Sequence, residues 1–421
     1  MNVGIICEYN PFHYGHEAHI KETKRLLGGQ CAVICVMSGN FVQRGDFAVY
    51  NKHARAEAAV RSGADLVIEL PTPYALCSAE GFARAGVFLL DSLGVCDFIS
   101  FGSETGSIEM LEEAAKALVL PEAASIMRKW LEQGLPYALA RQKAADELMG
   151  ARSQVLKKPN NLLGIEYLIA ISSLKSGLTP ITVARTGGEH DGVSGYSASA
   201  VRGMLLSGIL NGGAQSMPGG TSGQSALLDK GGELSLRVPH TALGVYENET
   251  AEGRGPVSIK HCELAILSRL REMDDYSKLP GVSEGLEHRF LKYSRQEATV
   301  AAILDKVKSK RYVMSRLRRM LLCACLNITA DDCAELPPYI RVLAMNSSGM
   351  KVLKEARKKA KLPIITKPAS ARGLGAQAVN LFCKEAVATD FYVLAYTGEK
   401  HRRGGSEWQT SPIVSQHLSG S

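Results

Sequence analysis

The feature that most constrains the fold is the alternation of short apolar runs with amphipathic helical patterns over residues 1–210. The first apolar run, residues 3–7, passes through a turn at Asn10-Pro11 into a helical pattern that extends from about residue 13 to residue 27. Further apolar runs follow at residues 31–37, 64–70, 96–101 and 179–185. This order predicts an α/β domain, residues 1–210, with a Rossmann-like five-stranded parallel sheet covered by helices on both faces. Ligands of such sheets bind beyond the carboxyl ends of the strands.

Two histidines lie where the first predicted strand gives way to the first helix. His13 and His16 flank Gly15 at the expected helix N-terminus. Backbone N–H groups there have no partner within the helix, and the helix dipole favours negative charge. A glycine allows close approach of a phosphate, and two imidazoles one turn apart donate hydrogen bonds to its oxygens. The stretch therefore predicts a binding site for a nucleotide phosphate; the alternative is a pair of surface histidines in a turn.

The other candidate residues also follow predicted strands or begin helices. Arg44 lies in a polar loop after the second strand, where its guanidinium would hold a carboxylate or a phosphate, unless it is an ordinary surface arginine. Gly102 follows the fourth strand and would let a base or ribose lie against the backbone. Asn160 and Asn161 precede a helix and offer amides to an adenine edge, although one of them would suffice as an N-cap. Arg185 ends the fifth strand, where its charge would face the phosphates.

A second phosphate site is predicted at the end of this domain. Ser197 and Ser199 lie at the start of a helix, and Arg202 lies within its first turns. A helix N-terminus with hydroxyl groups and a guanidinium favours a phosphate. Serine at an N-cap is ordinary by itself, so the prediction depends on the histidine pair at the other end of the domain.

The composition changes from about residue 211 onwards. Residues 211–255 are rich in glycine and serine and predict a flexible linker or a long surface loop. Residues 256–403 show amphipathic helical patterns, and residues 404–421 predict a disordered tail. The formal net charge of +7 comes from the part after residue 255, because acidic side chains outnumber basic ones before it.

This basic second half predicts either a polyanionic partner or a helical domain with a solvated basic surface. Basic side chains are densest over residues 306–319. They would hold a nucleic-acid backbone without reading bases. The residues chosen as candidates are Lys310, Arg311, Arg316, Arg318 and Arg319.

Other function classes receive no support from the sequence. No apolar run approaches the length of a membrane span and the N-terminus has no signal-peptide pattern, so a cytoplasmic protein is expected. The ten cysteines are scattered, and free buried thiols are favoured over a metal site at Cys323, Cys325 and Cys333. No metal ligand is assigned.

The motifs resemble those of a known superfamily. His13-x-Gly15-His16 matches the H-x-G-H signature of nucleotidyltransferases, and Ser197-x-Ser199-x-x-Arg202 matches their S-x-[ST]-x-x-R signature. Across both halves the chain also resembles one family, the bacterial tRNA(Met) cytidine acetate ligases. The segments that carry this resemblance are residues 8–16, 36–39, 43–45, 65–71, 101–104, 158–161, 197–202, 284–289 and 310–312.

This resemblance implies an ATP-dependent ligase that activates acetate as acetyl-adenylate. The acetyl group would pass to N4 of the wobble cytidine, C34, of elongator tRNA(Met), with release of AMP and pyrophosphate. His13, His16 and Arg202 would be catalytic, Arg44 would bind acetate or phosphate, and Mg²⁺ would accompany ATP. The residues implied in ATP binding are Cys7, Glu8, Tyr9, Asn10, Pro11, Phe12, His13, Tyr14, Gly15, His16, Glu17, Ala18, His19, Ile20, Gly102, Asn160, Asn161, Arg185, Ser197 and Ser199.

Two other functions remain open at this stage. A small-molecule adenylyltransferase of coenzyme biosynthesis would use the same two signatures, but it gives no reason for a long basic second half. An RNA-binding protein with a degenerate nucleotide fold would not need the intact histidines and Arg202. The sequence leaves the oligomeric state open.

Overall fold

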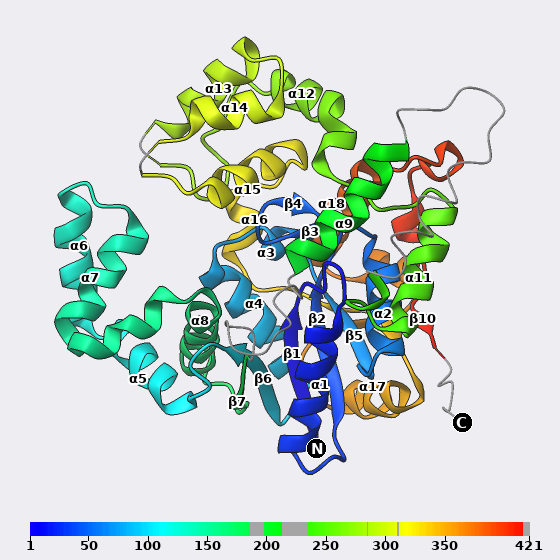
Figure 1. Ribbon diagram of the computed structural model, residues 1–421, viewed down its shortest axis with the longest axis horizontal. Helices are drawn as coiled ribbons and strands as arrows, with labels where there is room; N and C mark the ends of the chain where they lie inside the picture. Colours follow the sequence, from blue (N-terminus) through cyan, green and yellow to red (C-terminus); the bar gives the residue numbers. More distant parts are fainter. Residues whose placement is uncertain (186–197, 213–233, 284, 310, 416–421) are drawn as a thin grey trace.

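The protein is described by a computed structural model that covers residues 1–185, 198–212, 234–283, 285–309 and 311–415. A central sheet has helices on both faces, and a group of helices lies beyond its carboxyl edge (Figure 1). None of the helices in this part of the chain is long and apolar enough to span a bilayer.

The five predicted strands form the parallel part of the sheet, which confirms the α/β class. They are β1 (Asn2–Cys7), β2 (Ala32–Ser38), β5 (Leu66–Leu70), β6 (Phe98–Ser103) and β7 (Thr179–Ala184). The sheet order is β10-β8-β5-β2-β1-β6-β7, and neighbours from β5 to β7 are parallel. The carboxyl ends of β1 and β2 therefore lie side by side at one edge, where the first two loops meet.

The sheet has more strands than the five expected. It is eight-stranded in the described part of the chain, because β8 (Ile340–Met345), β9 (Ile364–Ile365) and β10 (Ile413–Val414) join it from the second half. Strand β8 runs antiparallel to β5, and every residue of both strands is buried. The second half is thus not helical throughout, because the backbone N–H and C=O groups along the buried edge of β5 need a partner strand.

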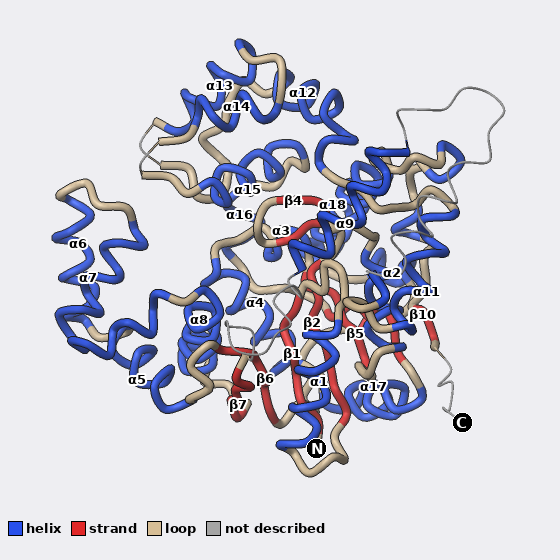
Figure 2. The backbone as a smooth tube through the Cα atoms, in the orientation of Figure 1, coloured by secondary structure: helices blue, strands red, loops and turns tan. Residues whose placement is uncertain are grey.

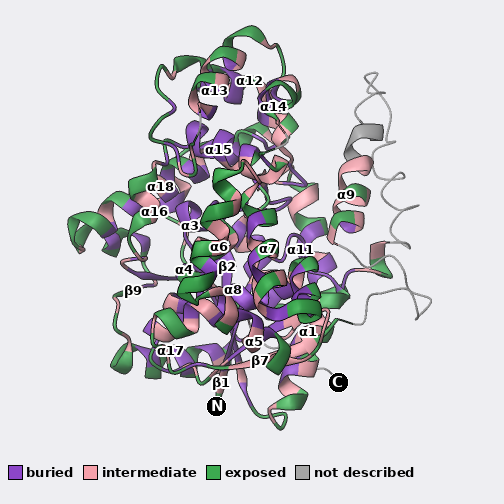
Figure 3. Cartoon of the chain, turned by 90° about the vertical axis from the view of Figure 1, so that its left-hand side faces the viewer, coloured by how far each residue is buried: buried purple, intermediate pink, exposed green. Residues whose placement is uncertain are grey.

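The helices of the first half cover both faces of the sheet (Figure 2). Those up to β7 are α1 (Tyr14–Leu26), α2 (Lys52–Arg61), α3 (Thr72–Ala75), α4 (Ala79–Ser92), α5 (Ile108–Leu118), α6 (Pro121–Glu132), α7 (Tyr137–Met149), η1 (Gly150–Lys157) and α8 (Pro159–Ser173). Helix α9 (Ala198–Gly212) and α11 (His240–Ala251) follow β7. Alternate strand residues point to opposite faces, so Val33 belongs to the core that includes residues of α2 and α11, whereas Ile34 belongs to the core that includes residues of α4 and α8. Buried residues accordingly concentrate along the strands and the inward helix faces (Figure 3).

The helices of the second half form a separate core and then return to the sheet. They are η2 (Ile259–Cys262), α12 (Glu263–Glu272), α13 (Leu286–Gln296), α14 (Val300–Val307), α15 (Met314–Cys325), α16 (Ala330–Ala334), α17 (Ser347–Lys359), η3 (Pro368–Gly373), α18 (Ala376–Val393), η4 (Glu399–His401) and η5 (Ser406–Trp408). The hairpin β3 (Phe41–Val42) and β4 (Asp46–Phe47), in the loop after β2, enters this helical core. Phe41 and Phe47 contact each other edge to face at 4.9 Å and both approach Tyr392. The loop that carries Arg44 is therefore held between the sheet and the helices.

Parts of the expected linker and tail are ordered. Helix α11 lies within 211–255 and packs on α2, with Tyr246 stacked on Tyr50 at 4.5 Å; residues 213–233 lie outside the described residues. Residues 404–415, expected to be disordered, contain η5 and β10, and the Glu407 side chain is buried. Buried ion pairs and strand pairing hold this segment, and neither is visible in its Gly/Ser-rich composition.

Candidate active site

The two histidines of the H-x-G-H motif form the N-terminus of α1. His13 is the N-cap and its Nδ1 accepts a hydrogen bond from the Gly15 N–H at 3.0 Å. His16 Nδ1 accepts from the His13 N–H at 3.3 Å, which completes a capping box. The two rings stack with their centroids 3.8 Å apart. Because both Nδ1 atoms accept, each neutral ring carries its proton on Nε2, and both Nε2–H groups are donors for a ligand.

The surroundings keep both imidazoles neutral. Burial, followed by the charges of Arg185 and Arg202, lowers the pKa of His13 to about 4. Burial and then the neighbouring His13 lower the pKa of His16 well below its usual value. The rings of Tyr9 and Phe12 lie 4.8 Å and 5.6 Å from the His16 ring and fix its orientation. At neutral pH the pair thus offers oriented hydrogen-bond donors without adding a full charge.

Arg202 approaches this helix terminus from the far end of the first half. Its Nη1 donates to the Asn10 carbonyl oxygen at 2.7 Å, and its Nη2 donates to Ser199 Oγ at 2.9 Å. Burial and then the charge of Arg44 lower the pKa of Arg202. The structure therefore brings Arg202 to the loop before α1, as the two signatures predict. Ser197 lies outside the described residues.

The two adjacent asparagines have different surroundings. The Asn161 Oδ1 accepts from the N–H groups of Glu104 and Thr105 at 2.8 and 3.2 Å, and its Nδ2 donates to the Val155 carbonyl at 3.1 Å. Its buried amide thus holds the loop after β6, which differs from the expected contact with adenine. Asn160 Nδ2 donates to Glu104 Oε1 at 2.7 Å, and its Oδ1 accepts from Arg185 Nη1 at 3.4 Å.

Asn160 thus contacts Arg185. A Cβ at Gly102 would lie 3.1 Å from the Arg185 side chain, so the absence of a side chain there leaves room for this guanidinium. Asn160, Gly102 and Arg185 form one group at the ends of β6 and β7. This group is the candidate for the adenosine side of a nucleotide site.

Residues 7–20 divide between the core and the site. The side chains of Tyr9, Phe12 and Ile20 lie in the hydrophobic core, so the nearby backbone and the imidazoles remain for a ligand. His19 Nε2 lies 3.0 Å from Ser100 Oγ. The remaining members are placed as follows: Cys7 ends β1, Asn10 and Pro11 are buried, Tyr14 and Ala18 are exposed, and Glu17 pairs with Lys21.

The loop after β2 is anchored at both of its faces. Glu8 Oε1 accepts from the Gln43 N–H at 2.6 Å, and the Gln43 carbonyl accepts from Arg319 Nη1 at 3.1 Å. Gly45 has a φ of +74°, and a Cβ there would lie 2.5 Å from the Arg319 backbone nitrogen. A glycine is required at this close approach to α15. Arg44 is therefore carried by a loop fixed between the end of β1 and α15.

The basic candidates in and before α15 are in different environments. Arg311 and Arg318 are exposed, whereas Arg319 is partly buried against the Gln43 carbonyl. Arg316 Nε donates to the Gly281 carbonyl at 3.1 Å, and its guanidinium lies 5.0 Å from the Tyr312 ring centroid. Lys310 lies outside the described residues. Of the four candidates within the described residues, Arg311 and Arg318 are exposed.

Sequence reasoning missed two residues that support the site. Glu104 accepts from the backbone N–H groups of Asn160 and Asn161 at 3.2 and 2.8 Å, at the start of α8. It belongs to the motif Phe101–Glu104, so its position among the matching residues was a usable signal. Arg55 is fully buried beneath both loops. Nothing in a helical stretch rich in alanine distinguishes Arg55 from a surface arginine.

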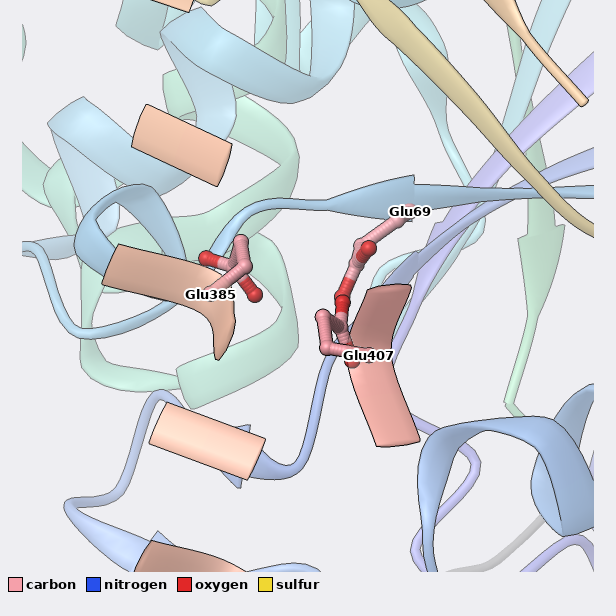
Figure 4. Close-up of side chains that lie close together, drawn as sticks. All are labelled: Glu69, Glu385 and Glu407. Atoms are coloured by element: carbon pink, nitrogen blue, oxygen red, sulfur yellow. The ribbon is translucent and has the colours of Figure 1, made fainter. Parts of the chain in front are cut away.

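A cluster of three buried carboxylates does not fit a metal centre. Glu69, Glu385 and Glu407 converge in the core, as Figure 4 shows. However, Lys52 Nζ donates to Glu69 Oε1 at 2.6 Å and to Glu407 Oε1 at 2.5 Å. Arg341 pairs with the same two carboxylates. The side chains of Lys52 and Arg341 thus already occupy the position where a metal ion would bind.

Comparisons with known proteins agree with this geometry. The family model described as HIGH Nucleotidyl Transferase matches residues 1–407. A tRNA(Met) cytidine acetate ligase of Acetivibrio thermocellus is 34% identical over 98% of this chain and 99% of its own length. One of Caldanaerobacter subterraneus subsp. tengcongensis is 38% identical over 94% of this chain and 95% of its own length.

Solved structures show the same likeness over the whole chain. Thermotoga maritima TmcAL bound with alpha-thio ATP matches with a TM-score of 0.86 at 31% identity, over 99% of both chains. Its apo form matches with a TM-score of 0.87. The likeness thus extends over both the sheet-bearing first half and the second half of the chain. This chain belongs to the family of tRNA(Met) cytidine acetate ligases.

Proposed function

We propose that this protein uses ATP to activate acetate and transfers the acetyl group to N4 of the wobble cytidine, C34, of elongator tRNA(Met). The observation that carries the proposal is the approach of Arg202, through the Asn10 carbonyl, to the stacked His13 and His16 at the N-terminus of α1. The family membership supports the choice of acetate and tRNA over other acceptors. ATP and tRNA are cytoplasmic reactants, so the cytoplasm is the proposed compartment.

The first step is attack of the acetate carboxylate on the α-phosphorus of ATP. Cytidine N4 does not attack free acetate, because its lone pair is delocalised and the carboxylate has no leaving group. Negative charge builds on the phosphoryl oxygens in the transition state, where the two Nε2–H donors and the helix terminus would stabilise it. Arg202 and Ser199 would hold the departing pyrophosphate. ATP enters as its Mg²⁺ complex, with no protein ligand assigned to the metal.

The second step is attack of N4 on the carbonyl carbon of acetyl-adenylate. The N4–carbonyl bond forms, the bond from that carbon to the adenylate oxygen breaks, AMP leaves, and N4 gives up one proton to the departing phosphate or to water. Asn160, Gly102 and Arg185 would hold the adenosine side through both steps. The exposed Arg311 and Arg318 would hold the tRNA backbone, and the fixed loop of Arg44 lies between this surface and the histidines.

One assay tests the reaction. Protein, ATP, labelled acetate and total tRNA are incubated, the RNA is digested, and N4-acetylcytidine is expected. Without RNA, acetate should still promote exchange between ATP and pyrophosphate. Pyrophosphate release with a phosphorylated coenzyme precursor, and none with acetate, would instead support a small-molecule adenylyltransferase.

A variant tests the role of the histidines. His16→Ala should lower acetate-dependent exchange by about 10²–10³-fold, the usual effect of removing one donor to a transition-state oxyanion. The variant should bind tRNA as the parent protein does, which a filter-binding assay measures. Unchanged exchange in a folded His16→Ala protein would refute the role of this histidine.

A further inference from the structure

Arg55 is a fully buried arginine near the middle of α2. Within the described residues, its four hydrogen bonds all go to backbone carbonyl oxygens. Nε donates to the Tyr50 carbonyl at 3.0 Å and Nη2 donates to the Ser38 carbonyl at 2.9 Å. Nη1 donates to the Glu8 carbonyl, and Nη2 also donates to the Gly39 carbonyl. These contacts therefore use four of the five N–H donors of the guanidinium.

These carbonyls belong to the two loops that build the site. Glu8 begins the loop that leads from β1 to His13, Ser38 is the last residue of β2, and Gly39 begins the loop that carries Arg44. Tyr50 lies at the end of this second loop, directly before α2. One guanidinium thus joins the start of the first loop to both ends of the second loop.

Burial of a charge that hydrogen-bonds only to neutral groups is costly. If the side chain at this position only had to fill the space, an apolar residue would stabilise the folded chain more. The planar fork of arginine can instead direct donors to carbonyls of separate segments, which neither lysine nor methionine can reproduce. The contacts therefore indicate that the two loops must keep a fixed position relative to each other.

We infer that Arg55 is a positioning residue for acetate activation, because it holds the loop of His13 in register with the loop of Arg44. This inference rests on the proposed function. The first loop presents the histidine donors to the α-phosphate of ATP, and the second presents Arg44 to the acetate carboxylate. A displacement of one loop by about 1 Å would lower the rate of attack by roughly 100-fold. The adenosine side lies at the ends of β6 and β7, and none of its three residues contacts Arg55.

The test compares Arg55→Lys with Arg61→Met. Arg61 lies on the same helix, is exposed and pairs with Glu57, so its loss controls for removal of a cation from α2. In acetate-dependent ATP–pyrophosphate exchange, Arg55→Lys should lower kcat by roughly 100-fold and raise the KM for acetate, with ATP affinity unchanged. Arg61→Met should behave as the parent protein. Equal effects on ATP affinity and on kcat would overturn the inference, because they would indicate general damage.

Amide hydrogen exchange gives a readout that does not depend on activity. Residues 8–13 and 38–44 should exchange faster in Arg55→Lys than in Arg61→Met, while α8 and β7 should not change. Unchanged exchange in both loops would overturn the inference. A parent protein with no acetate-dependent exchange of pyrophosphate would refute the proposed function alone, since the amide comparison still decides the role of Arg55.

A cavity variant covers the case in which Arg55→Lys does not fold. Arg55→Ala leaves space for a guanidinium ion, so added guanidinium should restore acetate-dependent exchange and methylammonium should not. Equal rescue by the two ions would contradict the inference, because charge alone would then be sufficient.

Discussion

At the scale of single residues, the site is made of side chains that serve both the fold and the proposed chemistry. His13 and His16 cap α1 through Nδ1, which leaves Nε2–H for a phosphate. Burial makes these imidazoles poor bases, so they remain neutral at physiological pH. The same burial links the site to the pH dependence of stability.

The free energy of unfolding should fall as the pH decreases from about 6.5 towards 4. The pKa values of His13 and His19 are lowered from 6.5 to about 4, chiefly by burial, so the unfolded chain binds protons in this range that the folded chain does not. Urea unfolding at pH 5 and pH 7 measures the difference. His13→Asn, which keeps an N-cap residue, should reduce it. His288→Asn, at an exposed histidine, should leave it unchanged; an equal effect of both variants would contradict this account.

The two asparagines should respond differently to substitution. Asn161→Ala should lower the free energy of unfolding by about 1–3 kcal/mol, because it leaves buried backbone groups near Glu104 without partners. Asn160→Ala should instead weaken ATP binding with little loss of stability. Urea titration and equilibrium dialysis measure the two effects. The reverse pattern would show that Asn161 is the ligand-binding member of the pair.

At the scale of elements, α15 connects the proposed tRNA surface to the site. Its exposed side carries Arg318, whereas Arg319 on the inner side donates to the Gln43 carbonyl in the loop of Arg44. Phe41 and Phe47 from the same loop lie in the helical core. Movement of the helical group would therefore change the position of this loop.

Substitutions of two neighbouring arginines on α15 should distinguish the roles of its exposed and inner sides. Arg318→Glu should weaken tRNA binding and reduce its dependence on salt, because a phosphate contact is lost, with acetate-dependent pyrophosphate exchange unchanged. Arg319→Ala should reduce this exchange even without tRNA, because the Gln43 loop loses an anchor. Filter binding at several salt concentrations and the exchange assay provide the two measurements. A loss of exchange in Arg318→Glu would contradict the separation of roles.

At the scale of the whole molecule, the second half completes the sheet of the first. The buried Glu69, Glu385 and Glu407 converge (Figure 4). Lys52 from α2 and Arg341 from β8, both buried, form ion pairs with these carboxylates. Three carboxylates face two cations, and burial followed by the charge of Glu69 raises the pKa of Glu385 to about 7. A proton on Glu385 would bring the net charge of the cluster to zero. These charges hold α2, and with it Arg55, to the C-terminal segment.

Deletion of residues 404–421 should therefore destabilise the protein strongly. Removal of Glu407 leaves the buried Lys52 and Arg341 short of a carboxylate, and loss of one partner of a buried ion pair costs about 3–5 kcal/mol. The control is deletion of residues 416–421 alone, which keeps Glu407 and β10. Urea unfolding of both proteins provides the measurement. Equal stability of the two deletions would show that Glu407 contributes little.

Much of the first half and of the site was accessible from sequence, because the signals are local. Apolar runs of strand length predict the parallel strands, and a histidine beside a glycine after a strand predicts a helix terminus that binds anions. The meeting of Arg202 with the loop of His13 was also predictable, since both motifs follow strands of one parallel sheet. These inferences need only neighbouring residues and a general rule of sheet topology.

The tertiary structure alone decided which of several similar residues carry a role. Asn160 and Asn161 have the same chemistry, yet only the packing of the loop after β6 makes one of them a structural amide. Arg55 and Arg61 share a helix, and only the loops above α2 distinguish them. Glu407 lies 355 residues from Lys52, in a stretch with the composition of a disordered tail. Burial and hydrogen-bond partners depend on contacts between distant segments, which no local pattern contains.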